Sequence, residues 1–189
     1  HCTLPNRNLF VLGSDQAVLL DPHTLYLEES VTLPTKLTKT FYNQGVVYCL
    51  ASDSLSLYGY ELKTKQWKTL CKLPEELPDP KWVSFKGNLL LTSSSASNLY
   101  QYNTKHNSFE QELVLPGKKL LCRDTEYIYV LGESKSYRVK EQRGNWEEVY
   151  TNLTAEPSDP LLYSGKIYFQ DQQGTTSFDP VTHSIISIF

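Results

Sequence analysis

Short apolar runs alternate with polar turns along the whole chain, and the pattern recurs about every forty residues. The clearest unit is 57–74, LYGYELKTKQWKTLCKLP, in which two alternating runs flank a polar turn and end at Leu-Pro. This pattern predicts two β-strands joined as a hairpin and stopped by proline. Similar units begin at residues 17, 57, 99, 136 and 175, so the steps are 40, 42, 37 and 39. Self-similarity at this period indicates a repeat architecture.

A second predicted hairpin precedes each unit. In the second repeat, for example, the runs 40–42 and 46–50 are joined through Asn43-Gln44-Gly45, and Gly and Asn supply the positive φ that tight turns need. Each repeat therefore has four short strands. Five such repeats without helical periodicity predict an all-β fold, a β-propeller, because one small sheet cannot bury both of its faces alone.

The repeats cover approximately 1–34, 39–74, 80–116, 118–154 and 159–189, in a single propeller domain or propeller fragment. Positions that recur in every repeat should serve packing. We expect buried strands to contain the following residues: Leu57, Tyr60, Leu99, Tyr102 and Val139. Trp67, Phe109 and Trp146 share one repeat position and are predicted to pack between blades. Truncation of Trp67 to Ala should then cost about 3–5 kcal/mol.

The turns inside the units carry a family resemblance. Asp21-Pro22-His23-Thr24 and Asp179-Pro180-Val181-Thr182 share an Asp-Pro-x-Thr pattern, and the best copies continue to an aromatic residue and Leu-Pro. This pattern resembles the second half of a kelch repeat over essentially the whole chain. The double glycine that usually ends the second kelch strand is missing, with single glycines at Gly13 and Gly132.

The resemblance implies kelch-like blades in a ring of six or seven, of which about five are legible. Two arrangements remain open. In the first, the ring closes by pairing the two chain ends. In the second, the chain is an open arc of a six-bladed ring, and the missing blade lies outside the chain. We favour the arc, which would expose strand edges and apolar blade faces and so promote association.

Composition adds limits on function. The 18 basic and 21 acidic residues give a net charge of −3, which does not suggest the basic face that nucleic-acid binding requires. No apolar run approaches the roughly 18 residues of a membrane span, and the first residues lack the apolar core of a signal peptide. We therefore expect a soluble cytoplasmic protein, with a nuclear location also open.

Candidate chemistry is sparse. The four cysteines form no CxxC pair, and Cys49 and Cys122 lie in apolar strands, which favours buried small side chains in a reducing compartment over disulfides or a metal. His23, His106 and His183 fall in the same turn of different repeats and should not converge on one ion. Because hydrolase and phosphate-loop motifs are absent too, we predict no metal, no cofactor and no catalysis.

Two functional classes follow. The resemblance implies a protein-binding module, in particular a substrate receptor of a cullin-RING ubiquitin ligase, joined to a BTB or F-box domain elsewhere in the protein. The alternatives are an enzyme on a kelch-like scaffold, such as an oxidase or isomerase, and a cytoskeletal or scaffold-binding kelch protein. An enzyme would need convergent His, Tyr or acidic residues near the propeller axis.

Loops between the second and third strands are the predicted binding surface. They share little sequence, all are polar, and four of the five hold an acidic residue. Such a rim suits a basic protein or peptide, with charge guiding the encounter; ordinary solvated turns are the alternative. The candidate residues are Asp15, Asp53, Ser54, Ser95, Glu133, Lys135, Asp171 and Gln172.

Overall fold

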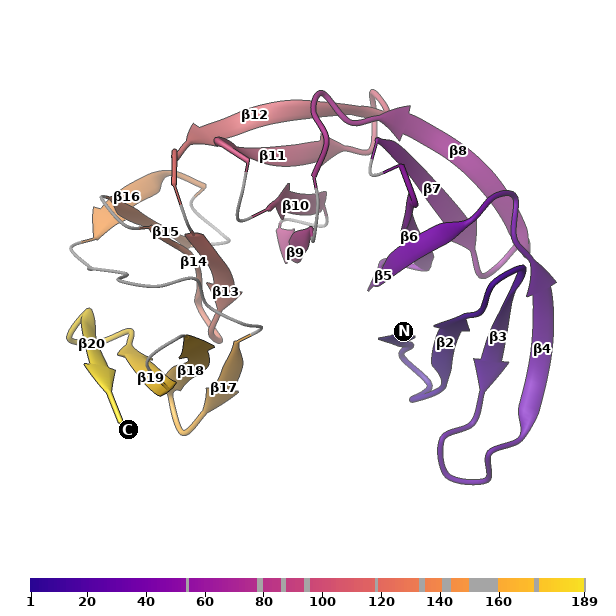
Figure 1. Ribbon diagram of the computed structural model, residues 1–189, viewed down its shortest axis with the longest axis horizontal. Coiled ribbons are helices and arrows are strands. Elements are labelled where there is room, and N and C mark those ends of the chain that lie inside the picture. The colour runs from indigo at the N-terminus through magenta and orange to yellow at the C-terminus, as the bar shows by residue number, and fades with distance from the viewer. Residues whose placement is uncertain are drawn as a thin grey trace. The chain divides into compact units, whose positions relative to one another are not determined.

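The computed structural model describes residues 1–53, 55–77, 80–85, 88–93, 96–117, 119–132, 135–140, 144–149, 160–171 and 174–188. Within these residues the regular structure is all β, in five four-stranded antiparallel sheets (Figure 1). In each sheet the four strands are neighbours in chain order, which confirms the four-stranded repeat. The described part of the chain contains no helix long and apolar enough to cross a membrane.

The sheets are called blades 1 to 5 in chain order. Blade 1 contains β1 (Cys2–Thr3), β2 (Leu9–Leu12), β3 (Gln16–Leu20) and β4 (Leu27–Thr32). Blade 2 contains β5 (Leu37–Asn43), β6 (Val46–Ala51), β7 (Ser56–Glu61) and β8 (Gln66–Lys72). Blade 3 contains β9 (Lys81–Phe85), β10 (Asn88–Thr92), β11 (Asn98–Asn103) and β12 (Ser108–Val114). Blade 4 contains β13 (Lys119–Arg123), β14 (Tyr127–Gly132), β15 (Ser136–Lys140) and β16 (Trp146–Val149). Blade 5 contains β17 (Leu161–Tyr163), β18 (Lys166–Asp171), β19 (Gly174–Asp179) and β20 (Ser184–Ser187).

Strand register confirms the alignment of the repeats. The residue that aligns with Trp67 lies opposite the same third-strand position in each of four blades. The pairs are Leu20 with Leu27, Tyr60 with Trp67, Val139 with Trp146, and Phe178 with Ile185. Residues directly opposite in an antiparallel pair share a face of the sheet, so each pair builds the same part of its blade.

The Leu-Pro pairs end the fourth strands by a recurring backbone hydrogen bond. The N–H of Leu33 donates to the carbonyl of Asp15 at 3.0 Å, that of Leu73 to Leu55 at 2.7 Å, and that of Leu115 to Ser97 at 2.8 Å. Each acceptor lies in the loop between the second and third strands of the same blade. The following proline has no N–H, so the ladder stops there.

The turn between the third and fourth strands also recurs. Asp21 accepts the backbone N–H of His23 at 2.8 Å, and Asp179 accepts that of Val181 at 2.9 Å, as in an Asx turn. The residue four positions after the start of this turn has positive φ in all five blades. These residues are Leu25, Lys65, Asn107, Gly144 and His183, with φ between 51° and 73°. Four of the five are not glycine, so the turn holds side chains in the left-handed region.

The chain divides into two compact units. Unit 1 comprises His1–Leu77 and Asn103–Phe109, and unit 2 comprises Pro78–Tyr102 and Glu110–Phe189. In unit 1, blades 1 and 2 share one core, whose buried residues include Phe10, Val47 and Tyr60. Trp67 packs against this core from blade 2, as predicted.

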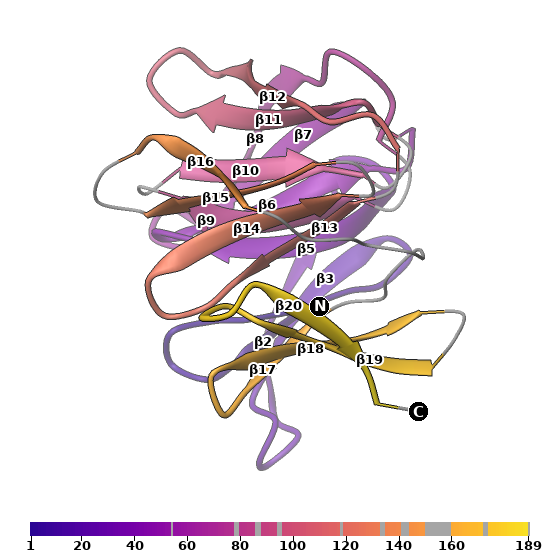
Figure 2. The same cartoon turned by 90° about the vertical axis from the view of Figure 1, so that its left-hand side faces the viewer.

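Among the described residues of unit 2, two clusters of buried apolar side chains join neighbouring blades. One joins blade 3 to blade 4 through residues such as Leu90 and Leu121, and the other joins blade 4 to blade 5 through residues such as Cys122 and Phe178. The strands of blades 4 and 5 can be followed in Figure 2. Successive residues of β13 contribute to opposite cores because side chains alternate across a strand. The five residues predicted to lie in buried strands, Leu57, Tyr60, Leu99, Tyr102 and Val139, are at most 1% exposed.

Candidate functional site

The predicted binding loops connect second and third strands, as the repeat pattern requires. Asp15 is exposed and accepts a hydrogen bond from the Ser14 hydroxyl at 3.3 Å. Lys135 is exposed as well, and Asp171 is the last residue of β18 rather than a loop residue. Ser54, Ser95, Glu133 and Gln172 lie outside the described residues. The part of these residues in partner binding stays a prediction.

Asp53 has a structural task within its own loop. Its carboxylate accepts the backbone N–H of Leu55 at 2.9 Å and that of Ser56 at 3.2 Å. The loop of blade 2 is therefore held from two sides, by Asp53 and by the bond from Leu73 to Leu55. The exposed carboxylate still contributes its negative charge to the rim.

Histidines and cysteines lie where the sequence predicted. His23, His106 and His183 occupy the turns between third and fourth strands, and the described residues contain no group of His, Cys, Asp and Glu side chains suited to a metal ion. The four cysteines are free thiols, and Cys49 and Cys122 are buried. Burial raises the pKa of all four thiols, that of Cys71 to about 11, so they stay protonated near neutral pH.

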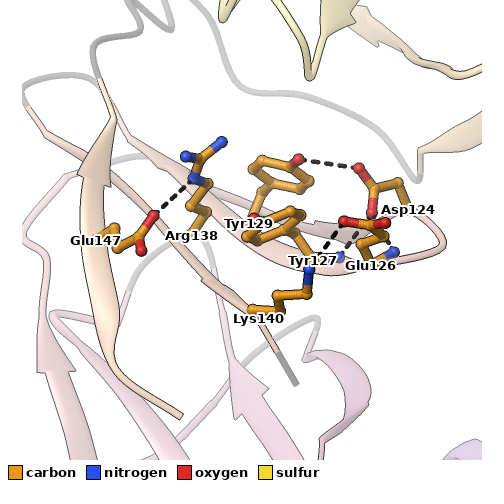
Figure 3. A network of polar contacts seen from close by, with 7 residues as sticks. All are labelled: Asp124, Glu126, Tyr127, Tyr129, Arg138, Lys140 and Glu147. Carbon is orange, nitrogen blue, oxygen red and sulfur yellow. Dashed lines mark hydrogen bonds and ion pairs between the residues drawn. The ribbon is translucent and has the colours of Figure 1, made fainter. Parts of the chain in front are cut away.

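Blade 4 contains a polar network that the repeat pattern of the sequence did not predict (Figure 3). Arg138 on β15 donates from Nε to Glu147 Oε2 at 3.1 Å and from Nη1 to His183 Nε2 at 2.9 Å. Its guanidinium carbon lies 4.7 Å from the centre of the Tyr127 ring. Arg138 thus links the third and fourth strands of blade 4 to the last turn of blade 5.

The second half of the network is built on Asp124, in the turn between β13 and β14. One carboxylate oxygen accepts the backbone N–H groups of Glu126 and Tyr127, both at 2.7 Å, and the other accepts the Tyr129 hydroxyl at 2.9 Å. Burial, with the hydrogen bond and charge of Asp124, raises the pKa of Tyr129. Tyr129 is therefore neutral and keeps its proton for Asp124.

His183 is held in one form by Arg138. Burial and the adjacent Arg138 charge lower the pKa of His183, so the imidazole is neutral at pH 7. A guanidinium can only donate hydrogen bonds, so Nε2 is the acceptor and the ring proton sits on Nδ1. The turn that places His183 also gives it a φ of 55°.

A pocket of about 330 Å³ lies between blades 4 and 5 beside this network. Blade 4 supplies mostly polar and aromatic lining, and blade 5 supplies mostly apolar lining. The lining residues are Asp124, Thr125, Glu126, Tyr127, Tyr129, Arg138, Leu162, Gly165, Pro180 and Val181. The pocket lies at the end of blades 4 and 5 that holds the turns from the first to the second strand and from the third to the fourth strand. The predicted binding loops, which join the second strand to the third, lie at the other end of the strands.

One sequence signal could have pointed to Arg138. The register places it at the position filled in the other blades by Leu19, Gly59, Gln101 and Ser177. None of these four residues is charged, so Arg138 departs from the repeat pattern. Such a departure indicates that the residue makes interactions specific to its own blade. Its contact with His183, 45 residues away, has no counterpart in the sequence pattern.

Comparisons with known proteins support the architecture. No family model matches the sequence, and no curated protein matches it. Among solved structures, virginiamycin B lyase from Staphylococcus aureus superposes with a TM-score of 0.72 at 12% identity, over 98% of this chain and 67% of that chain. A catalytically inactive variant of this lyase with quinupristin gives 0.71 at 11% identity, over the same 98% and 67%. The N-terminal domain of Nup159 gives 0.64 at 11% identity, over 94% of this chain and 57% of that domain.

These structures are β-propellers. The chain has the β-propeller fold. At a sequence identity of 11–12%, the likeness to these structures shows the fold alone, and the kelch type of the blades stays a prediction. The propeller spans 57–67% of the chains that it resembles.

Proposed function

We propose that this propeller is a non-catalytic protein-binding module. The observation that carries the proposal is the repeated hydrogen bond from the Leu-Pro leucine to the loop between second and third strands. It fixes the backbone of this loop in blades 1, 2 and 3, while the loop side chains differ from blade to blade. A rigid frame that displays variable loops is the usual construction of a recognition surface.

The charge of these loops favours a basic partner. The carboxylates of Asp15 and Asp53 are exposed in unit 1, where they can attract a Lys- or Arg-bearing segment and guide the encounter. Within this class we propose the kelch type that the sequence resembles, and with it a substrate receptor for a cullin-RING ubiquitin ligase in the cytoplasm. The cullin-binding domain would lie outside this chain.

A peptide library tests the binding proposal. The full-length protein is exposed to random peptides whose charged positions are basic, acidic or neutral, and bound peptides are sequenced. Basic peptides should be enriched, and the double variant Asp15→Asn with Asp53→Asn should bind them about three- to fivefold more weakly per charge removed, as exposed ion pairs predict. Asn keeps a side-chain carbonyl for the Leu55 and Ser56 N–H groups, so the blade 2 loop stays folded.

The matched control removes positive charge at the opposite end of the strands. Lys63 and Lys105 are exposed residues of the turns that follow β7 and β11, and Lys63→Asn with Lys105→Asn should leave peptide binding unchanged. Equal binding by the acidic-loop variant and the parent would contradict the site, and a lack of peptide enrichment would contradict the function. Copurification of cullin-RING subunits with the full-length protein tests the ligase assignment separately.

A further inference from the structure

Arg138 has unused hydrogen-bonding capacity at the pocket between blades 4 and 5. A guanidinium carries five N–H groups. One is donated to Glu147 and one to His183, so three remain without an acceptor among the described residues. Arg138 is also one of the residues that line the pocket.

The carboxylates of the same wall are already engaged. Asp124 accepts three hydrogen bonds from its own turn and from Tyr129, and Glu126 pairs with Lys140 at 3.3 Å. Lys140 offsets the charge of Glu126, and the turn N–H groups and the Tyr129 hydroxyl bind Asp124, so the charged donor left for a ligand in this wall is Arg138. A ligand group that only accepts hydrogen bonds, above all a carboxylate, matches it.

The guanidinium is also held in position before any ligand arrives. It lies over the Tyr127 ring and is fixed along its Nε edge by Glu147. The Glu147 side chain is 56% exposed, so water screens much of its compensating charge. His183 is neutral and adds no negative charge. A guanidinium fixed in this way favours a charge-assisted hydrogen bond from its remaining N–H groups to a carboxylate.

The opposite wall is apolar. Leu162, Pro180 and Val181 of blade 5 line it, and the Val181 side chain is 87% exposed at the rim. The volume of about 330 Å³ is at the lower end of the range for small-ligand sites. It suits one compact apolar group with its polar end turned toward Arg138.

We propose that this pocket binds a carboxylate carried by a small apolar body. A free hydrophobic carboxylic acid and the C-terminal residue of a peptide both present this chemistry. The site is independent of the proposed function, since it lies at the other end of the strands from the variable loops.

Calorimetric titration of the full-length protein tests the chemistry of the ligand. The probes are an acetylated tripeptide that ends in leucine with a free carboxylate, the same tripeptide as a C-terminal amide, and N-acetyl-leucine. The free carboxylate should bind about tenfold or more tightly than the amide, and Arg138→Gln should remove this difference, as expected for one charge-assisted hydrogen-bonded pair. N-acetyl-leucine that binds as tightly as the acid tripeptide indicates a free acid as the ligand, and tighter binding of the tripeptide indicates a peptide terminus.

Variants at the rim keep the test valid if Arg138→Gln fails to fold. Val181 is exposed, so Val181→Glu and Val181→Lys should both fold, the first weakening and the second strengthening binding of the free carboxylate. Lys166→Gln removes a cation of blade 5 that pairs with Asp179 outside the pocket lining, and should change nothing. Equal binding of acid and amide, equal binding by the two Val181 variants, or no binding of any probe at millimolar concentration would overturn the proposal.

Discussion

Trp67→Ala probes the packing between blades 1 and 2. The Trp67 ring lies 5.0 Å from the Tyr60 ring of its own blade and 6.2 Å from the Phe10 ring of blade 1. Its Nε1 donates to the carbonyl of Thr32, also in blade 1, at 2.9 Å. Truncation to Ala removes one ring contact within blade 2, and one ring contact and one hydrogen bond between blades 1 and 2.

The structure lowers the expected cost of this truncation. A fully buried Trp replaced by Ala costs about 3–5 kcal/mol, but Trp67 is only half-buried. Each aromatic pair contributes about 0.5–1.5 kcal/mol beyond burial, and the Thr32 carbonyl is exposed enough for water to replace the lost donor. We therefore expect a loss of about 2–4 kcal/mol in the free energy of unfolding.

Urea denaturation followed by circular dichroism measures this loss. Trp67→Phe keeps the ring contacts and loses the N–H donor, so it should cost about 1 kcal/mol. Tyr26 is 69% exposed in blade 1, and Tyr26→Ala should stay within about 0.5 kcal/mol of the parent. If Trp67→Ala costs less than about 1 kcal/mol, the ring does not hold the two blades together and the packing argument is wrong.

Three further predictions concern a turn, a histidine and an apolar face. Leu25 is 73% exposed at a φ of 56°, so Leu25→Gly should raise the unfolding free energy by about 0.5–1 kcal/mol in urea, whereas Thr24→Gly should lower it. The unfolded chain protonates His183 near pH 6.5, whereas the folded chain does so only at lower pH, so the free energy of unfolding should fall as the pH drops below about 6.5. The plot of Tm against pH should become flatter in His183→Asn, and an unchanged plot would contradict this. Tyr163 is 68% exposed on β17, beside Leu161, and should promote association that Tyr163→Lys reduces in sedimentation velocity; a parent protein that is monomeric at all concentrations would refute it.

The sequence alone determined the strands, the hairpins and the repeated packing positions. Strand alternation and turn chemistry are local, so the spacing between Tyr60 and Trp67 was enough to predict that they flank one turn and share one face. The capping of its own loop by Asp53 is also local and could have been predicted, because Asp commonly accepts the N–H groups two and three residues later.

Only the tertiary structure showed the pocket and the network around Arg138. His183 and Arg138 are 45 residues apart, and they meet because blade 5 packs against blade 4 through Tyr129 and Phe178. That contact depends on how two sheets pack, and a pattern of apolar and polar residues specifies which face is buried but not which polar groups meet at its edge. The sequence thus determined the blades, and the packing of blade on blade determined the site.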